Sequence, residues 1–190
     1  MFNSYSLASP VEHRLSYSLN LLALLGISFS LIIAFFYQFA FNELPCPLCQ
    51  LQRLGLILVG MGFMLNAQFG SSSIHYAMAI SGALAGGATS MRQILLHIAP
   101  GDTGYGSTFL GFHFYTWGFI SFVMVIAFTA FMLLIDHKNF STPRQQRLGW
   151  VALLIISLFI ILSLANTVSS VMVCGLGPCP DNPLQYIISF

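Results

Sequence analysis

Charged residues are scarce in this sequence. Asp, Glu, Lys and Arg make up only 6% of its 190 residues, whereas soluble globular domains carry roughly 25%. Hydrophobic residues make up 57%, so the chain could not cover a water-facing surface with polar groups, and the apolar excess must face lipid. The net charge of +1, without any cluster of Lys or Arg, excludes nucleic-acid binding. The composition predicts an integral membrane protein.

Two sequence signals are also lacking. The Gly-rich connection Ala99–Gly111 does not end in the Lys-Ser/Thr pair of a phosphate-binding loop, so nucleotide binding is unsupported. The first apolar run, Leu19–Phe41, is too long for the hydrophobic core of a signal peptide and has no small-residue cleavage site. We therefore expect this run to remain as the first membrane span.

Five apolar segments have about the 20 residues that a helix needs to cross a bilayer. They are Leu19–Phe41, Leu48–Leu65, Ile74–Ile98, Phe112–Ile135 and Leu148–Val173. The short connections between them indicate antiparallel neighbours in a compact bundle. The expected fold class is all-α: a polytopic transmembrane helix bundle of five spans that forms one domain over residues 1–190, with residues 174–190 as a tail.

The orientation is predicted from the positions of Lys and Arg, which are enriched in short cytoplasmic loops. Arg14 precedes the first span, and Lys138, Arg144 and Arg147 lie between the fourth and fifth. With five crossings these two positions fall on the same side of the membrane. The N-terminus is therefore expected inside and the C-terminus outside.

All four cysteines of the chain fall on the predicted outer face. Cys46 and Cys49 follow the first span, and Cys174 and Cys179 follow the fifth. An oxidising compartment favours disulfides over free thiols. The pattern indicates disulfide chemistry. For Cys174 and Cys179, a purely structural disulfide that fixes the tail is an open alternative.

The segment Cys46-Pro47-Leu48-Cys49 is a C-x-x-C unit at the start of a predicted helix. The unsatisfied N–H groups and the dipole of a helix start lower the pKa of a thiol below its usual value of about 8.5, which favours rapid exchange. Arg53 follows Cys49 by four residues and so shares its helical face, where its charge can stabilise a thiolate or the oxyanion of a reduced acceptor. The alternative is that Arg53 only anchors the span at the membrane interface.

The run Pro45-Cys46-Pro47-Leu48-Cys49-Gln50-Leu51-Gln52-Arg53, after a first span and opening a second, resembles the bacterial DsbB/DsbI disulfide bond formation family. The resemblance covers about the first hundred residues. It implies a four-helix core, to which this chain adds a C-terminal span, and a multi-pass protein of the bacterial inner membrane. The implied activity is that of a quinone-dependent protein-disulfide oxidoreductase, which supports disulfide bond formation.

In that family the soluble partner is a periplasmic thioredoxin-fold dithiol oxidase (DsbA-like), and electrons pass from it to a membrane quinone, either ubiquinone or menaquinone. The resemblance places the quinone beside Cys49 and Arg53, with Cys46 exchanging with a second cysteine pair. This chain departs from the best-known pattern because Ala99–Gly111 contains no cysteine. The redox-active second pair is then expected at Cys174 and Cys179.

Arg92, Gln93 and His97 form a polar patch near the outer end of the third predicted span. A charged residue there must face the bundle or extend toward the interface. In the resembled family a polar residue near this point lines the quinone pocket, so Gln93 and His97 are candidates for that role. The bland alternative for His97 is a hydrogen-bonded structural histidine, and haem ligation by His97 with His113 is a further alternative.

Three other functions fit parts of the sequence less well. A four-cysteine zinc site would use C-x-x-C as ligand spacing, but the second pair is spaced differently and the compartment favours disulfides, so no metal is expected. A non-catalytic membrane subunit with two structural disulfides would be expected to line a pathway with more polar residues than this chain offers. Vitamin K epoxide reductase relatives carry their C-x-x-C in a late helix, whereas this one opens the second span.

Overall fold

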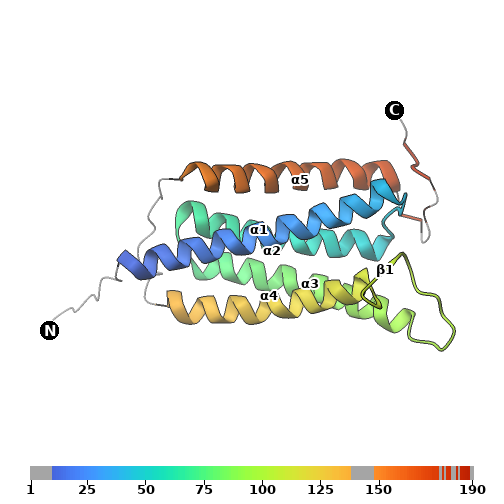
Figure 1. The fold of residues 1–190 in the computed structure, drawn as a ribbon, viewed down its shortest axis with the longest axis horizontal. Coiled ribbons are helices and arrows are strands. Elements are labelled where there is room, and N and C mark those ends of the chain that lie inside the picture. The colour runs from blue at the N-terminus through green and yellow to red at the C-terminus, as the bar shows by residue number, and fades with distance from the viewer. Residues whose placement is uncertain are drawn as a thin grey trace.

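The structure, a computed structural model, describes residues 10–137, 148–175, 177, 179–180, 183 and 185–188. The described residues form five α-helices and one two-stranded hairpin, and the helices lie side by side as a bundle (Figure 1). The helices are α1 Pro10–Ala40, α2 Pro47–Phe69, α3 Ser73–Leu96, α4 Phe114–Asp136 and α5 Trp150–Cys174. The all-helical fold class is therefore confirmed, and α1 begins at Pro10 rather than at the predicted Leu19.

Four of the helices in the described part of the chain are long and apolar enough to cross a membrane. These are α1 from Arg14 onward, α2, α4 and α5. α3 has 24 residues, which is long enough, but glycine, serine and threonine dilute its apolar content and it carries Arg92. Five helices are confirmed, while a membrane crossing by α3 stays a prediction.

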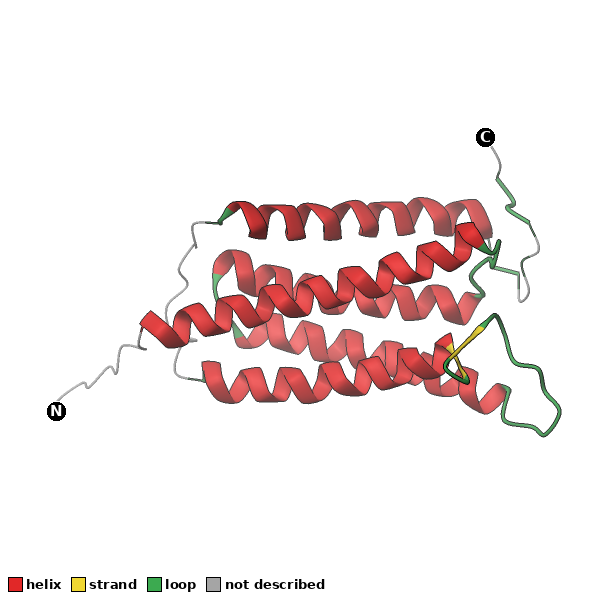
Figure 2. Ribbon diagram, in the orientation of Figure 1, coloured by secondary structure: helices red, strands yellow, loops and turns green. Residues whose placement is uncertain are grey.

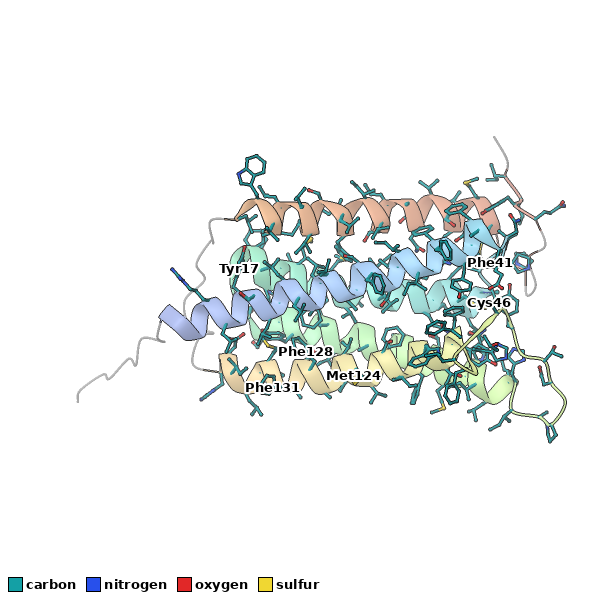
Figure 3. The ribbon with its side chains drawn as sticks, viewed as in Figure 1. Tyr17, Phe41, Cys46, Met124, Phe128 and Phe131 are labelled. Carbon is teal, nitrogen blue, oxygen red and sulfur yellow. A yellow bond between two sulfur atoms is a disulfide. The ribbon has the colours of Figure 1, made fainter. Side chains whose placement is uncertain are left out.

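The bundle places large apolar side chains on its outside. Met124, Leu134 and Leu154 are 67%, 74% and 68% exposed, and Figure 3 shows Met124 among the side chains that surround the bundle. Several polar side chains, including those of Asn20 and Gln38, are instead buried. This distribution is the reverse of that in a soluble protein and suits a lipid environment, so the chain is a membrane protein.

Glycines allow α2 and α3 to pack in direct backbone contact. A Cβ atom on Gly82 would lie 2.9 Å from the Gly55 carbonyl oxygen and 2.9 Å from the Val59 nitrogen, both on α2. Gly82 and Gly86 form a small-x-x-x-small pair, the spacing that lets membrane helices approach closely. α3 packs in turn on α4, while α5 packs mainly on α1.

A buried polar cluster joins four helices at the end of the bundle where α1 begins. Asp136, at the end of α4, accepts hydrogen bonds from Ser16 (2.7 Å) and Tyr76 (2.6 Å). Asn20 donates to the Tyr76 hydroxyl (3.0 Å), and Asn66 donates to Asn20 (3.1 Å). These bonds connect α1, α2, α3 and α4, and such satisfied interior networks fix helix register.

The opposite end of the bundle carries the cysteine-bearing segments. The α1–α2 loop, the α3–α4 connection and the segment after α5 all lie there, as Figure 1 shows. The α3–α4 connection contains a short antiparallel hairpin, β1 Thr108–Phe109 and β2 Phe112–His113, coloured as strands in Figure 2. The prediction that all four cysteines share one end is confirmed. Lys138, Arg144 and Arg147, on which the predicted orientation rests, lie outside the described residues.

Replacing Gly82 with alanine should destabilise the bundle, because the added methyl group would meet the α2 backbone rather than a movable side chain. We expect Gly82→Ala to lower the free energy of unfolding by about 1–3 kcal/mol, seen as a lower Tm in detergent micelles. Gly87→Ala, on the same helix, is the matched control, because its methyl group would meet only the Phe122 Cβ at 3.5 Å. Equal Tm values for the two variants would contradict the close packing of α2 on α3.

Candidate redox site

Cys46 and Cys49 form a disulfide at the start of α2. The helix begins at Pro47, whose fixed φ suits the first helical position. Cys46 is the N-cap residue, and its Sγ accepts a hydrogen bond from the Cys49 backbone N–H (3.1 Å). The disulfide therefore lies where unpaired N–H groups favour negative charge on sulfur after reduction.

Gln93 of α3 lies directly beside this disulfide. Its Nε2 is 3.5 Å from the Cys46 sulfur and 3.7 Å from the Cys49 sulfur. Gln52 donates to the Gln93 Oε1 (2.8 Å), which turns the Gln93 NH₂ group toward the sulfurs. Of the polar patch predicted on α3, Gln93 is thus buried at the disulfide, whereas Arg92 is exposed.

Arg53 is buried and is held by α1. Its guanidinium donates to the Gln38 Oε1 (2.6 Å) and to the Ala34 carbonyl oxygen (3.0 Å), and it lies over the Phe35 ring at 5.3 Å from the centroid. Only 7% of the residue is exposed. An interfacial anchor would extend into the headgroup layer, so this burial disfavours the anchor alternative.

A cavity of about 320 Å³ lies between these groups. Cys49 supplies sulfur to its lining, and its polar side chains include Arg53, Gln52, Gln93 and the carboxylate of Glu43. Aromatic residues line much of the remainder: Tyr37, Tyr105, Phe109, Phe114, Tyr115, Trp117 and Phe122. Apolar walls with a few convergent polar groups are typical of small-molecule sites. The volume of this cavity is at the low end of the range for such sites, roughly 300–1,000 Å³.

The α3–α4 connection lies over the cavity and is fastened to the α1–α2 loop. Tyr105 donates to the Leu44 carbonyl oxygen (2.6 Å), and the Ser107 backbone N–H donates to Glu43 (3.0 Å), as does the Ser107 hydroxyl. Burial, followed by the charge of Glu43, raises the pKa of Tyr105, so its hydroxyl keeps the proton that it donates. The connection thus forms a fixed cover over the cavity.

His97 lies apart from the disulfide. Its Nδ1 is 3.1 Å from Asp102, and its ring stacks on Tyr115 at 5.7 Å, while His113 stacks on the same ring at 5.1 Å. The Gly104 backbone N–H, followed by His97, lowers the pKa of Asp102. His97 and His113 therefore contact the α3–α4 connection and the Tyr115 ring. His97 is not among the residues that line the cavity.

Cys174 and Cys179 form the second disulfide, just after α5. Cys174 is only 9% exposed and packs with Leu44, Cys179 and Tyr186. Leu44 belongs to the loop that leads into Cys46, so the two disulfides are neighbours at one end of the bundle. Among the residues that the structure describes, no three His, Cys, Asp or Glu side chains are grouped so that they could hold a metal ion.

Several residues around the site were not identified from the sequence. They are Gln38, Glu43, Gln52, Tyr105 and Tyr186. Gln38 did carry a signal, since an amide within an apolar run must find hydrogen-bond partners inside the bundle. The loop residues carried none, because only the folded chain brings the α3–α4 connection onto the α1–α2 loop.

The comparisons with known proteins match just under half of the chain, the part that carries the first disulfide. Residues 16–105 match the family model described as disulfide bond formation protein DsbB. These residues are similar to the DsbB family. They contain Cys46, Cys49, Arg53 and Gln93, whereas α4, α5 and the second disulfide lie beyond the matched DsbB region.

Three curated relatives carry the name disulfide bond formation protein B. That of Chromobacterium violaceum is 34% identical over 99 residues, which is 48% of this chain and 60% of the relative. That of Stutzerimonas stutzeri is 34% identical over 89 residues, 45% of this chain and 55% of the relative. That of Burkholderia pseudomallei is 32% identical over 102 residues, 52% of this chain and 58% of the relative. The chain therefore spans somewhat over half the length of each of these relatives. No solved structure matches it significantly.

Replacing Gln93 with leucine should make the Cys46–Cys49 disulfide harder to reduce. The Gln93 NH₂ group lies near both sulfurs, and a donor stabilises a thiolate more than a disulfide sulfur. We expect Gln93→Leu to shift the thiol–disulfide equilibrium against glutathione by about two- to tenfold, measured by alkylation of the free thiols. His97→Leu, at the C-cap of the same helix but outside the cavity lining, is the control. A shift of equal size in both variants would contradict the role of Gln93.

Proposed function

We propose that this chain is a membrane protein-disulfide oxidoreductase that re-oxidises a periplasmic thioredoxin-fold dithiol oxidase and passes the electrons to a membrane quinone. By re-oxidising this partner at the bacterial inner membrane, the protein supports disulfide bond formation in other proteins. The observation that carries the proposal is the covered cavity in which Cys49, Arg53 and Gln93 converge. In this proposal residues 1–190 form one membrane domain, and its outer tail, residues 174–190, carries the second disulfide.

The lining of the cavity suits a quinone. Aromatic walls can stack on a flat ring, and Arg53, Gln52 and Gln93 offer N–H groups to its carbonyl oxygens. A buried guanidinium favours the negative charge that develops on oxygen during reduction. Ubiquinone and menaquinone share these features. When bound, the quinone supplies the oxidising power that a cysteine pair lacks.

The electron path runs through both disulfides. The partner's dithiol reduces Cys174–Cys179 and leaves as a disulfide, and the resulting dithiol then reduces Cys46–Cys49 by thiol–disulfide exchange. The dithiol of Cys46 and Cys49 gives two electrons and two protons to the quinone, which becomes a quinol while the disulfide re-forms. A soluble dithiol oxidase at about −120 mV needs such an acceptor, because only a more oxidising couple can recharge it.

We further propose that all five helices cross the membrane, with the N-terminus inside and the cysteine-bearing end outside. α3 is as long as α2 and packs on α2 and α4, and its polar side chains Tyr76, Ser90 and Gln93 are buried inside the bundle, while Arg92 near its end is exposed. An alkaline phosphatase fusion after Phe190 should be active, and a fusion within residues 138–147 should be inactive. Activity of a cytoplasmic reporter at Phe190 would reverse the orientation and contradict the proposal.

The charge of Arg53 should control the use of quinone rather than of the thiol partner. We expect Arg53→Gln to raise the KM for quinone about tenfold or more, since a hydrogen bond to a charged group contributes about 1.5–3 kcal/mol. Arg53→Lys should restore part of the loss, because lysine keeps the charge without the planar fork. Turnover assays with each substrate varied in turn measure both KM values.

The exposed Arg92 of α3 provides the matched control for that measurement. Arg92→Gln removes the same charge from the neighbouring helix and should leave both KM values unchanged. If Arg53→Gln raised the KM for quinone and for the thiol partner by the same factor, Arg53 would have no specific part in acceptor binding.

A further inference from the structure

Gln38 is the side chain that accepts a hydrogen bond from Arg53 and helps to hold it in place. It lies in α1, is 1% exposed, and accepts the 2.6 Å hydrogen bond from Arg53 through its Oε1. Its Nε2 donates to the Ser169 hydroxyl of α5 (2.7 Å) and to the Tyr186 hydroxyl (3.1 Å). In all three hydrogen bonds of the Gln38 side-chain amide, a donor faces an acceptor.

Arg53 fixes which way the Gln38 amide faces, and the two hydroxyls hold the amide in that position. The guanidinium has only donors, so the Gln38 carbonyl oxygen is turned to it, and the NH₂ group donates to the Ser169 and Tyr186 hydroxyls. A flipped amide would place N–H groups against the guanidinium, which has only donors to offer. Tyr186 therefore helps to orient Arg53 without touching the cavity, since it is absent from the cavity lining.

Tyr186 belongs to the segment that carries the second disulfide. Its side chain packs in one cluster with Leu44, Cys174 and Cys179. The next residues are fastened to α5, because the backbone N–H groups of 187 and 188 both donate to the Met172 carbonyl oxygen (2.9 and 3.2 Å). The position of the Tyr186 hydroxyl thus depends on the same segment that the Cys174–Cys179 bond closes.

We propose that Tyr186 is a positioning residue for Arg53, acting through Gln38, and that the closed Cys174–Cys179 disulfide thereby favours acceptor binding in the cavity. This inference rests on the proposed quinone-linked function. Opening the disulfide frees the segment, withdraws the Tyr186 hydroxyl from Gln38 and lets Arg53 leave its position. The quinone then binds best after the second disulfide has re-formed, when the electrons have reached Cys46 and Cys49.

Fluorescence of Trp117 measures quinone binding without turnover. Trp117 lines the cavity, whereas Trp150, the other tryptophan, is 83% exposed at the start of α5 and can be replaced in a Trp150→Phe background. The full-length protein is titrated with short-chain ubiquinone and menaquinone analogues. The analogue that quenches Trp117 fluorescence at the lower concentration is then used to measure the Kd for quinone in every variant.

Tyr186→Phe removes only the hydroxyl, and we expect it to raise this Kd about two- to tenfold, the effect of one neutral hydrogen bond. In turnover assays the KM for quinone should rise while kcat at saturating quinone stays within about twofold, a split that a general loss of structure would not give. Tyr17→Phe is the matched control, because Tyr17 lies near the end of α1 that is opposite to Gln38 (Figure 3). It should leave the Kd for quinone unchanged.

The coupling to the disulfide is tested by combining variants. Cys174→Ser/Cys179→Ser should raise Kd as Tyr186→Phe does, and the triple variant should show no further rise, because both changes break one connection. By reciprocity, the quinone analogue should make Cys174–Cys179 harder to reduce by the same factor. An unchanged Kd in Tyr186→Phe, or additive effects in the triple variant, would overturn the inference. Absence of quenching in the parent protein would instead overturn the quinone-linked function itself.

Discussion

The redox site depends on Arg53, a buried cation. In the described part of the chain, the groups that contact its guanidinium are all neutral. Arg53 is held by the Gln38 amide, the Ala34 carbonyl and the face of Phe35. Burial of a charge without an opposite charge is costly, so these partners must be fixed by the surrounding helices if Arg53 is to stay in place. Because none of these direct partners is a carboxylate, the guanidinium keeps its positive charge for an electron acceptor in the cavity, whose only acidic lining residue among those described is Glu43.

The bundle supplies this rigidity by different means at its two ends. Where α1 begins, the cluster around Asp136 links α1, α2, α3 and α4. At the cysteine-bearing end, Tyr105 and Glu43 hold the α3–α4 connection over the cavity. Between the ends, glycine contacts such as that of Gly82 with Gly55 bring α2 and α3 together and so place Gln93 beside the disulfide. The reacting sulfurs are thereby held against one wall of a covered cavity.

The sequence predicted the helices because apolar runs of bilayer length leave few alternatives, and it predicted Arg53 because spacing along one helix fixes a shared face. It also placed all four cysteines at one end through the parity of the crossings. It could not separate Gln93 from His97, since that distinction depends on how α3 is rotated against α2. Nor could it find Tyr186, because the contact of the outer segment with Gln38 joins residues far apart in the chain. Such contacts follow from packing and leave no local pattern.

The relay through two disulfides is the central claim, and the Cys174→Ser/Cys179→Ser variant tests it most directly. The measurement compares two reactions of this variant: reduction of quinone by its pre-reduced Cys46–Cys49 pair in a single turnover, and steady-state turnover with a reduced thioredoxin-fold dithiol partner. We expect about one quinol per protein in the first reaction, since one dithiol supplies two electrons, and no turnover in the second. Full steady-state turnover of the variant would show that the partner reacts directly with Cys46–Cys49, and would contradict the relay.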